Sequence, residues 1–296
     1  MELLLEDLPQ HGLWLIGPSS PYYDQWLAEI GSRPDGLPAV PDDFIDESER
    51  PGSAIWVNGS GKDVAAWSFV WRYEDLNGRV TSRTVSTGGT ATPSLLHPFG
   101  LSEDYRRKLR YSSVMLAGSK RWVGGGRVVG SNTDVRQPAE EERSGGMLFG
   151  FGRGGDDPMD WSMLRRTTLV LDGVFFVDGT FAGPDQAGLW GRVVHTAEVT
   201  AELARIAHEG RARGDAPQVL YALLAEAAKG PVEPGTPPPP PTRPASTGAE
   251  VGDAVDEVHR GLGSMIGLMR QHSGDEATLE RLASWHGTVL PDFRRL

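Results

Sequence analysis

The stretch VAAWSFVWRYE, residues 64–74, decides the fold class of this chain. Its aromatic residues recur at every second position: Trp67, Phe69, Trp71 and Tyr73. Side chains of a β-strand alternate between the two faces of a sheet, so these four share one face. The opposite face carries Ser68, Arg72 and Glu74, with Val70 as the exception. Because an antiparallel sheet commonly turns its polar face to water, we predict that the aromatic face lies in a core.

A second interpretation makes the same face a binding platform. Exposed Trp67, Trp71 and Tyr73 could stack on sugar rings, as aromatic side chains do in carbohydrate-binding proteins. This interpretation requires the aromatic face to be exposed, so the burial of these residues decides between the two.

The neighbouring segments extend the strand pattern. SAIWV at 53–57 precedes the long strand, and TSRTVS at 81–86 follows it after Asn77-Gly78, a dipeptide typical of tight hairpin turns. We predict a meander of three antiparallel strands, with NGSGKD at 58–63 as a hairpin turn. A phosphate-binding loop is excluded there, because Trp56 and Asp63 stand where that motif needs glycine and a hydroxyl residue.

The stretch LDGVFFVDGTFAGPD at 171–185 holds three aspartates that raise the question of a catalytic carboxylate pair. We predict strands at 167–171 and 174–177, which are rich in β-branched and apolar residues. Asp172-Gly173 then suits a bulge or strand break, and Asp178-Gly179 a turn. The alternative is that Asp172, Asp178 and Asp185 include the carboxylate pair of a glycosidase.

Helical periodicity appears near the N-terminus and again after Trp190. A short helix capped by Ser20 is expected within 20–31. The segments 193–214 and 216–230 follow with apolar stripes, first Val199, Leu203 and Ile206, then Val219, Leu220, Leu223 and Leu224. Five consecutive prolines then predict an extended linker.

The last apolar seam comprises Val251, Val255, Val258, Leu262, Met265 and Met269. Three partners are open to this seam: the segment EATLERLASWHG at 276–287, the sandwich, or another molecule. A helical hairpin is favoured, because Ser273, Gly274 and Asp275 supply a turn between two helical patterns. Gly261, Gly263 and Gly267 are expected to weaken the first helix.

The residues from Ile55 to Val80 resemble the opening hairpins of bacterial immunoglobulin-like domains of the FxLYD type. The positions that carry the resemblance are Val57, Asn58, Ser60, Lys62, Asp75, Gly78 and Arg79. With the aspartate-rich stretch and the helix pair, the chain is similar over about residues 53–228 to uncharacterised bacterial proteins that carry this sandwich. The resemblance implies an antiparallel immunoglobulin-like sandwich, and it implies no activity.

Composition excludes several classes of protein. The net charge of −11 argues against a nucleic-acid binder, which needs clustered Lys and Arg. The chain has no cysteine, and hence no disulfide, thiolate zinc site or Cys nucleophile. No transmembrane segment and no signal peptide are predicted, so the default location is cytoplasmic, with envelope association left open.

Local motifs add no chemistry. GFGRGG at 150–155 matches a dinucleotide fingerprint but lacks its strand–helix context, and Asp156 and Asp157 would repel a phosphate. The seven histidines include no zinc-protease pair: Ala212 stands where the second ligand after His208 would be. We therefore predict no catalytic, cofactor-binding or metal-binding residues.

The sequence predicts a mainly β protein with additional helices, in five segments. These are an N-terminal extension with a short helix (1–50), a β-sandwich (51–192), a helix pair packed on it (193–229), a proline-rich linker (230–249) and a helical C-terminal segment (250–296). The expected function is non-enzymatic binding or scaffolding, through a protein partner or self-association at 250–286. The alternative is a carbohydrate-binding or carbohydrate-active protein that uses aromatic residues and turn carboxylates.

Overall fold

The computed structural model describes residues 1–31, 47–86, 115–124, 127–129, 160–234, 251–287 and 292–296. It has mixed α and β content, with two sheets and five α-helices among these residues. The chain divides into two compact units: the described residues up to Ala187 with Arg295 and Leu296, and those from Gly188 to Arg294. The motif at 150–155 and most of the predicted linker lie outside the described residues.

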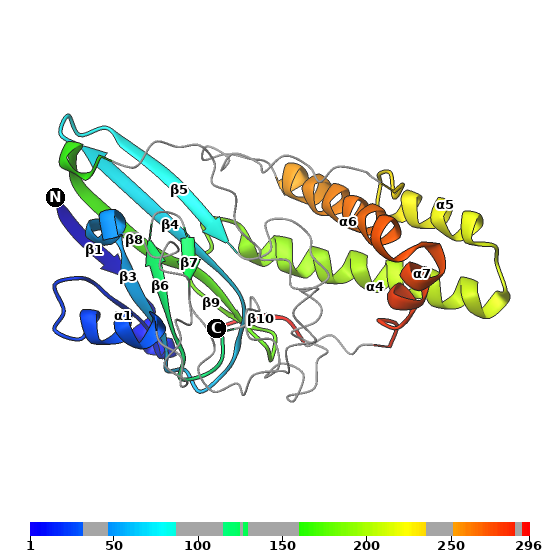
Figure 1. Ribbon diagram of the computed structural model, residues 1–296, viewed down its shortest axis with the longest axis horizontal. Helices are drawn as coiled ribbons and strands as arrows, with labels where there is room; N and C mark the ends of the chain where they lie inside the picture. Colours follow the sequence, from blue (N-terminus) through cyan, green and yellow to red (C-terminus); the bar gives the residue numbers. More distant parts are fainter. Residues whose placement is uncertain (32–46, 87–114, 125–126, 130–159, 235–250, 288–291) are drawn as a thin grey trace. The chain divides into compact units, whose positions relative to one another are not determined.

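The larger sheet of the first unit is built around two long strands, drawn side by side in Figure 1. These are β4 (Val64–Asp75) and β8 (Leu164–Phe176), which pair antiparallel. Outside β4 lies β5 (Val80–Ser86). The other edge of β8 pairs in parallel with β1 (Glu2–Glu6) and antiparallel with β9 (Thr180–Ala182), beside which β10 (Arg294–Arg295) lies. Because β1 runs parallel to β8, the larger sheet is mixed and not purely antiparallel as predicted.

The smaller sheet is antiparallel and has four strands in the order β2 (Leu13–Ile16), β3 (Ala54–Asn58), β6 (Lys120–Gly124) and β7 (Arg127–Val129). The predicted three-strand meander is therefore wrong. Only β4 and β5 form the expected hairpin, at the Asn77-Gly78 turn, whereas β3 and β4 belong to different sheets. Residues 58–63 connect the two sheets instead of making a hairpin turn.

Both sheets contribute to one hydrophobic core. Trp67, Phe69, Trp71 and Tyr73 of β4 are all buried in it, which confirms the prediction that the aromatic face is core. Facing them from the smaller sheet are Leu13, Leu15, Trp56 and Val123. The rings of Trp56 and Phe69 meet edge to face with their centroids 5.3 Å apart, an arrangement that aromatic pairs prefer.

The first 31 residues are integrated with this structure. The strands β1 and β2 supply an edge to each sheet, although the sequence predicted only a helical extension here. The predicted helix is present as α1 (Tyr23–Gly31), and the Ser20 hydroxyl accepts a hydrogen bond from the Tyr22 backbone N–H. Buried Tyr23 and Ile30 pack on Ile55 and Trp122, on the opposite face of the smaller sheet from the main core.

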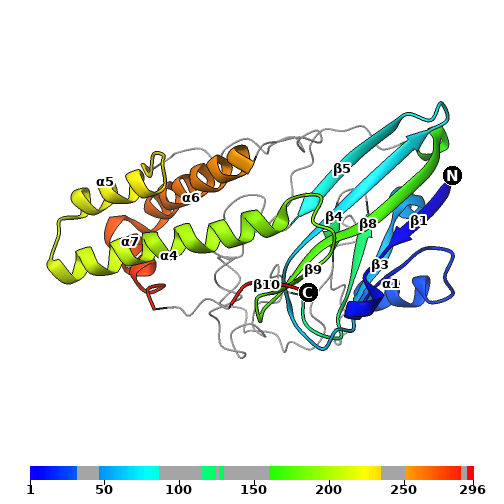
Figure 2. The same cartoon turned by 180° about the vertical axis from the view of Figure 1, so that it is seen from behind.

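The described residues of the second unit form four helices, which can be followed in Figure 2. They are α4 (Leu189–Arg213), α5 (Pro217–Ala227), α6 (Val251–Ser273) and α7 (Asp275–Ala283). The turn at Gly274, with φ +78°, joins α6 and α7 where a turn was predicted. Apolar residues from all four helices form one cluster. The α6–α7 hairpin therefore packs against α4 and α5, a partner that was not among the three predicted for the apolar seam of α6.

The packing of α6 and α5 differs in detail from the predicted stripes. Gly263 of α6 is buried, and a Cβ there would lie 3.0 Å from the Pro231 carbonyl oxygen, so this glycine permits close approach of backbones. In α5, Leu220 and Leu224 are buried, whereas Val219 and Leu223 are exposed. The buried face of α5 is therefore displaced from the predicted stripe, because Tyr221 is buried in place of Val219 and Leu223.

Candidate functional site

The three aspartates considered for catalysis each have a structural partner. Asp172 is fully buried at a bulge in β8, where its two carboxylate oxygens accept hydrogen bonds from the backbone N–H groups of Gln186 and Ala187 at 2.7 and 2.8 Å. The Ser68 hydroxyl donates a third hydrogen bond to Asp172, at 3.2 Å. Ser68, which was predicted on the polar face of its strand, is therefore buried and has a hydrogen-bond partner. A carboxylate that accepts three hydrogen bonds is suited to fixing a loop.

Asp178 and Asp185 are engaged separately. Asp178 follows β8 in the predicted turn, in which Gly179 has φ +83°, and its carboxylate lies 2.7 Å from the Lys62 ammonium. Asp185 pairs with Arg295 at 2.7 Å. Each of the three aspartates therefore has its own structural partners: hydrogen-bond donors for Asp172, and a cation for Asp178 and for Asp185. Within the described ranges, no group of three or more His, Asp or Glu side chains could hold a metal ion.

Of the residues that carry the family resemblance, Asn58, Ser60 and Lys62 hold the connection between the two sheets, whereas Asp75, Gly78 and Arg79 lie at the turn between β4 and β5. Asn58 is fully buried, and its Nδ2 donates to the backbone carbonyl oxygens of Lys62 and Leu116 at 2.9 and 3.1 Å. Its Oδ1 accepts a hydrogen bond from the Ser60 hydroxyl at 2.6 Å. The role of this motif is therefore structural.

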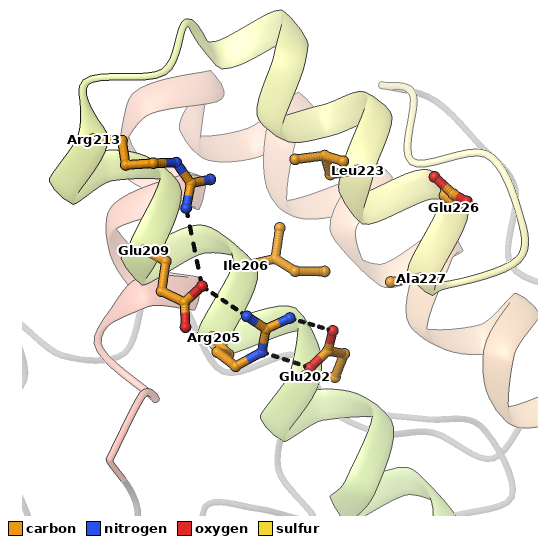
Figure 3. A pocket seen from close by; sticks show the side chains of 8 residues that line it. All are labelled: Glu202, Arg205, Ile206, Glu209, Arg213, Leu223, Glu226 and Ala227. Carbon is orange, nitrogen blue, oxygen red and sulfur yellow. Dashed lines mark hydrogen bonds and ion pairs between the residues drawn. The ribbon is translucent and has the colours of Figure 1, made fainter.

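A groove between α4 and α5 has a volume of about 440 Å³. Figure 3 shows its lining: Glu202, Arg205, Ile206, Glu209 and Arg213 from α4, and Leu223, Glu226 and Ala227 from α5. The apolar members lie between two sets of charged side chains. A smaller site, about 50 Å³, is bordered by the Glu29–Lys120 ion pair and offers no comparable apolar surface.

The α4 side of the groove is lined by an ion-pair network. Arg205 binds both carboxylate oxygens of Glu202 at 2.7 and 2.8 Å and reaches Glu209 at 2.7 Å. Hydrogen bonds to Glu202 and Glu209 raise the pKa of Arg205, and the Arg205 guanidinium lowers the pKa of Glu202. Arg213 pairs with Asp215 at 2.8 Å and lies 4.0 Å from Glu209. These charges are largely compensated within α4 and its C-terminal turn.

The α5 side is different, because an apolar and an acidic residue remain open to solvent there. Leu223 is 38% exposed, and Glu226 makes no ion pair with any residue in the described part of the chain. The sequence pattern did not predict this site, because Leu223 was placed in the apolar stripe of the helix. Val219, Leu220, Leu223 and Leu224 span about 140° of the helix surface, which is the width of an ordinary core-facing stripe. The local pattern therefore gave no signal that Leu223 would face outward.

Comparison with protein-family models, with curated proteins and with solved structures finds no match to this chain. Among the helices that the structure describes, none combines the length and the apolar character needed to cross a membrane.

Proposed function

We propose that this chain is a non-enzymatic binding protein, and that the groove between α4 and α5 is the docking surface for an amphipathic helix of a protein partner. The observation that carries the proposal is the solvent-exposed Leu223 beside Ile206 and Ala227, bounded by charged residues on both sides. An apolar strip between two helices with a polar rim is the surface that recognises a helix through its apolar face.

The residues of the groove specify the chemistry of the partner. The strip formed by Ile206, Leu223 and Ala227 suits two apolar side chains spaced three or four residues apart, which lie on one face of a helix. Because Arg205 is already bound by two carboxylates, it offers little to an acidic partner. Among the described residues Glu226 has no such partner, so the helix should place a Lys or Arg beside it.

Selection of peptides on the full chain tests this proposal. A library of amphipathic helical peptides is selected on the wild-type protein, and the enriched peptides are measured by fluorescence anisotropy. Leu223→Glu should weaken them at least about tenfold, because it places a charge in the apolar strip. Val219→Glu is the matched control, since Val219 is 52% exposed on the same helix but does not line the groove.

Two results would reject the groove. The first is a set of peptides that bind wild type and Leu223→Glu equally, and the second is failure to enrich any peptide. If the enriched peptides carry no Lys or Arg at the position beside Glu226, and Glu226→Gln binds them as tightly as wild type, then the proposed charged contact with Glu226 is wrong.

Carbohydrate binding is the second candidate, and one observation favours it. Trp67, Trp71 and Tyr73 are buried and cannot stack on a sugar, but Tyr22 and Trp26 of the α1 region form a stacked pair with centroids 5.5 Å apart, and Tyr22 is 56% exposed. Titration with chito- and cello-oligosaccharides should then change tryptophan fluorescence in wild type and not in Tyr22→Ala. Absence of a saturable change in wild type would remove this candidate.

We further propose that the sandwich is immunoglobulin-like, as the resemblance implies. The two sheets with a common core support this arrangement, and so does the position of Asn58 at the crossing between them. Self-association through 250–286 stays a prediction, which sedimentation of the full chain over a range of concentrations would test.

A further inference from the structure

Two histidines from different helices meet inside the second unit. The rings of His195 on α4 and His259 on α6 lie with their centroids 4.9 Å apart at 68°, edge to face. His259 is 6% exposed. One nitrogen of each ring, Nε2 of His195 and Nδ1 of His259, is buried without a hydrogen-bond partner among the described residues. Such a nitrogen is tolerated when it is unprotonated, but a proton added to it would have no acceptor, and the resulting charge would be buried.

The groups around His259 come from three helices. The Ala227 carbonyl at the end of α5 accepts a hydrogen bond from the ring, and the Lys229 ammonium acts on it from the same region. On α4, His195 contacts the ring, and Glu198 lies 3.7 Å from His195 Nδ1. On α6 itself, Asp256 is the nearby acid. None of the charged groups that act on His259 among the described residues comes from α7.

The balance of these groups disfavours the charged imidazole. Burial lowers the pKa of His259 most, and Lys229 and His195 lower it further, whereas the Ala227 carbonyl and Asp256 act in the opposite direction. In an unfolded or detached α6 the ring would return to its ordinary pKa, near 6.5. The packed state therefore binds fewer protons than the open state. Its stability is fully present above about pH 6.5 and is lost as the pH falls toward the lowered value.

We propose that the His195–His259 contact makes the attachment of the α6–α7 hairpin to α4 and α5 sensitive to acid. Protonation places a charge on a buried ring that faces a second histidine and a lysine, and only separation of α6 from α4 returns that charge to water. Separation would uncover apolar residues of the shared cluster, among them Leu203 and Leu262. A mildly acidic environment would thus convert the closed helical unit into one with new apolar surface.

A second histidine pair in the same unit provides an internal control. His208 on α4 stacks on His286 beyond α7, with centroids 4.3 Å apart, but both residues are exposed. Water can solvate these rings when they are protonated, so this pair should contribute little to the acid response.

Hydrogen exchange of the full chain at pH 7.5 and pH 5.0, corrected for the intrinsic pH dependence of exchange, tests the proposal. Because pH 5.0 lies about 1.5 below the ordinary histidine pKa, the lowered pKa of His259 should raise the opening constant of α6 across this interval by a factor of up to about thirty. His259→Gln keeps an N–H donor for the Ala227 carbonyl but cannot be protonated, and it should abolish the increase. His208→Asn is the control and should retain it. NMR titration of the His259 ring in the wild-type chain should show its transition at the pH where α6 begins to exchange.

Opening of α6 that does not change with pH in the wild type would overturn the proposal. So would an acid response that persists in a folded His259→Gln variant, or one that disappears in His208→Asn. If His259→Gln fails to fold, the NMR titration decides: a ring that titrates at or above the ordinary histidine pKa contradicts the mechanism.

Discussion

The guanidinium carbon of Arg270 lies 3.7 Å from the centroid of the Tyr221 ring, so that α6 and α5 are joined by a cation–π contact. The same guanidinium donates to the Val232 carbonyl oxygen at 2.9 Å and pairs with Glu233 and Asp275 at 3.0 Å each. The Tyr221 hydroxyl in turn donates to the backbone carbonyl of Asp275 at 2.9 Å. One side chain on α6 thereby connects α5, the segment after it and the start of α7.

Replacement of this arginine should destabilise the second unit. Arg270→Met removes the cation–π contact and the ion pairs, and we expect a loss of about 2 kcal/mol, since the acidic partners are partly solvated. Arg270→Lys should recover less than half of this, because an ammonium cannot reproduce the planar set of donors. Urea unfolding followed by circular dichroism at 222 nm measures the change. The exposed Arg281 of α7 is the control, and equal effects of Arg281→Met and Arg270→Met would contradict the assignment.

Gly183 should be among the least replaceable glycines of the first unit. Its φ is +121°, and a Cβ there would overlap the carbonyl oxygen of Asp172. Gly183→Ala should therefore cost about 3 kcal/mol or prevent folding, because strain and overlap act together. Gly61→Ala is the comparison: φ is +74° but nothing lies within 4 Å, and about 1 kcal/mol is expected. Thermal melts in which the two variants behave alike would show that the close approach to Asp172 is unimportant.

Trp71 should contribute to the free energy of folding as a buried aromatic residue. It is fully buried, and its ring N–H lies 3.4 Å from the Gly52 carbonyl oxygen. Trp71→Ala should cost about 3–5 kcal/mol, whereas Trp14→Ala, at a residue that is 38% exposed, should cost roughly 1 kcal/mol. Chemical denaturation of both variants provides the measurement. A Trp71→Ala protein that is as stable as wild type would mean that the core is assembled differently.

Asp178 should contribute to acid sensitivity below about pH 4. Burial raises the pKa of this carboxyl, but the hydrogen bonds from Lys62 and Thr180 outweigh it and lower the pKa overall. The folded state thus releases its proton more readily than the unfolded chain. This contribution is present above the unfolded pKa of about 3.9 and is lost as the pH falls through the lowered folded value.

Because the side chain is 41% exposed, we expect a contribution under about 1 kcal/mol. Asp178→Asn should flatten the fall in stability between pH 4 and pH 2.5. An unchanged slope in that variant would assign the acid sensitivity to other carboxyls.

Local sequence patterns predicted the strands and helices themselves better than the pairing and packing between them. The aromatic alternation of β4 and the turn at Asn77-Gly78 depend on residues adjacent in sequence, and both are present as expected. The pairing of β3 was predicted incorrectly, because a short polar connection between strands is compatible with a hairpin and with a crossing between sheets. What distinguishes them here is the burial of Asn58 and its hydrogen bonds to the carbonyls of Met115 and Leu116, more than 50 residues away, which leave no local signal.

The helical unit shows the same limitation. Periodicity indicated α4, α5 and α6, but the composition of α6 was interpreted as weak because of its glycines. Gly263 in fact faces Pro231, so a residue that lowers helix propensity allows the backbones to approach. The groove could not have been found from the α5 stripe, which has the width of an ordinary core-facing stripe. The His195–His259 contact could not be predicted either, because the two histidines lie 64 positions apart without a shared motif.

The pairing of β1 with β8 has a consequence for synthesis of the chain. Glu2 aligns with Arg166, so the first strand has no partner in this sheet until the ribosome has made about 164 further residues. At roughly 5–20 residues per second this delay is on the order of 10–30 s. During that interval Leu3 and Leu5 belong to a nascent segment without its final neighbours, although β2 and β3 can already pair with each other. Completion of the larger sheet is therefore a late event, and agents that bind the nascent β1 segment have a defined time in which to act.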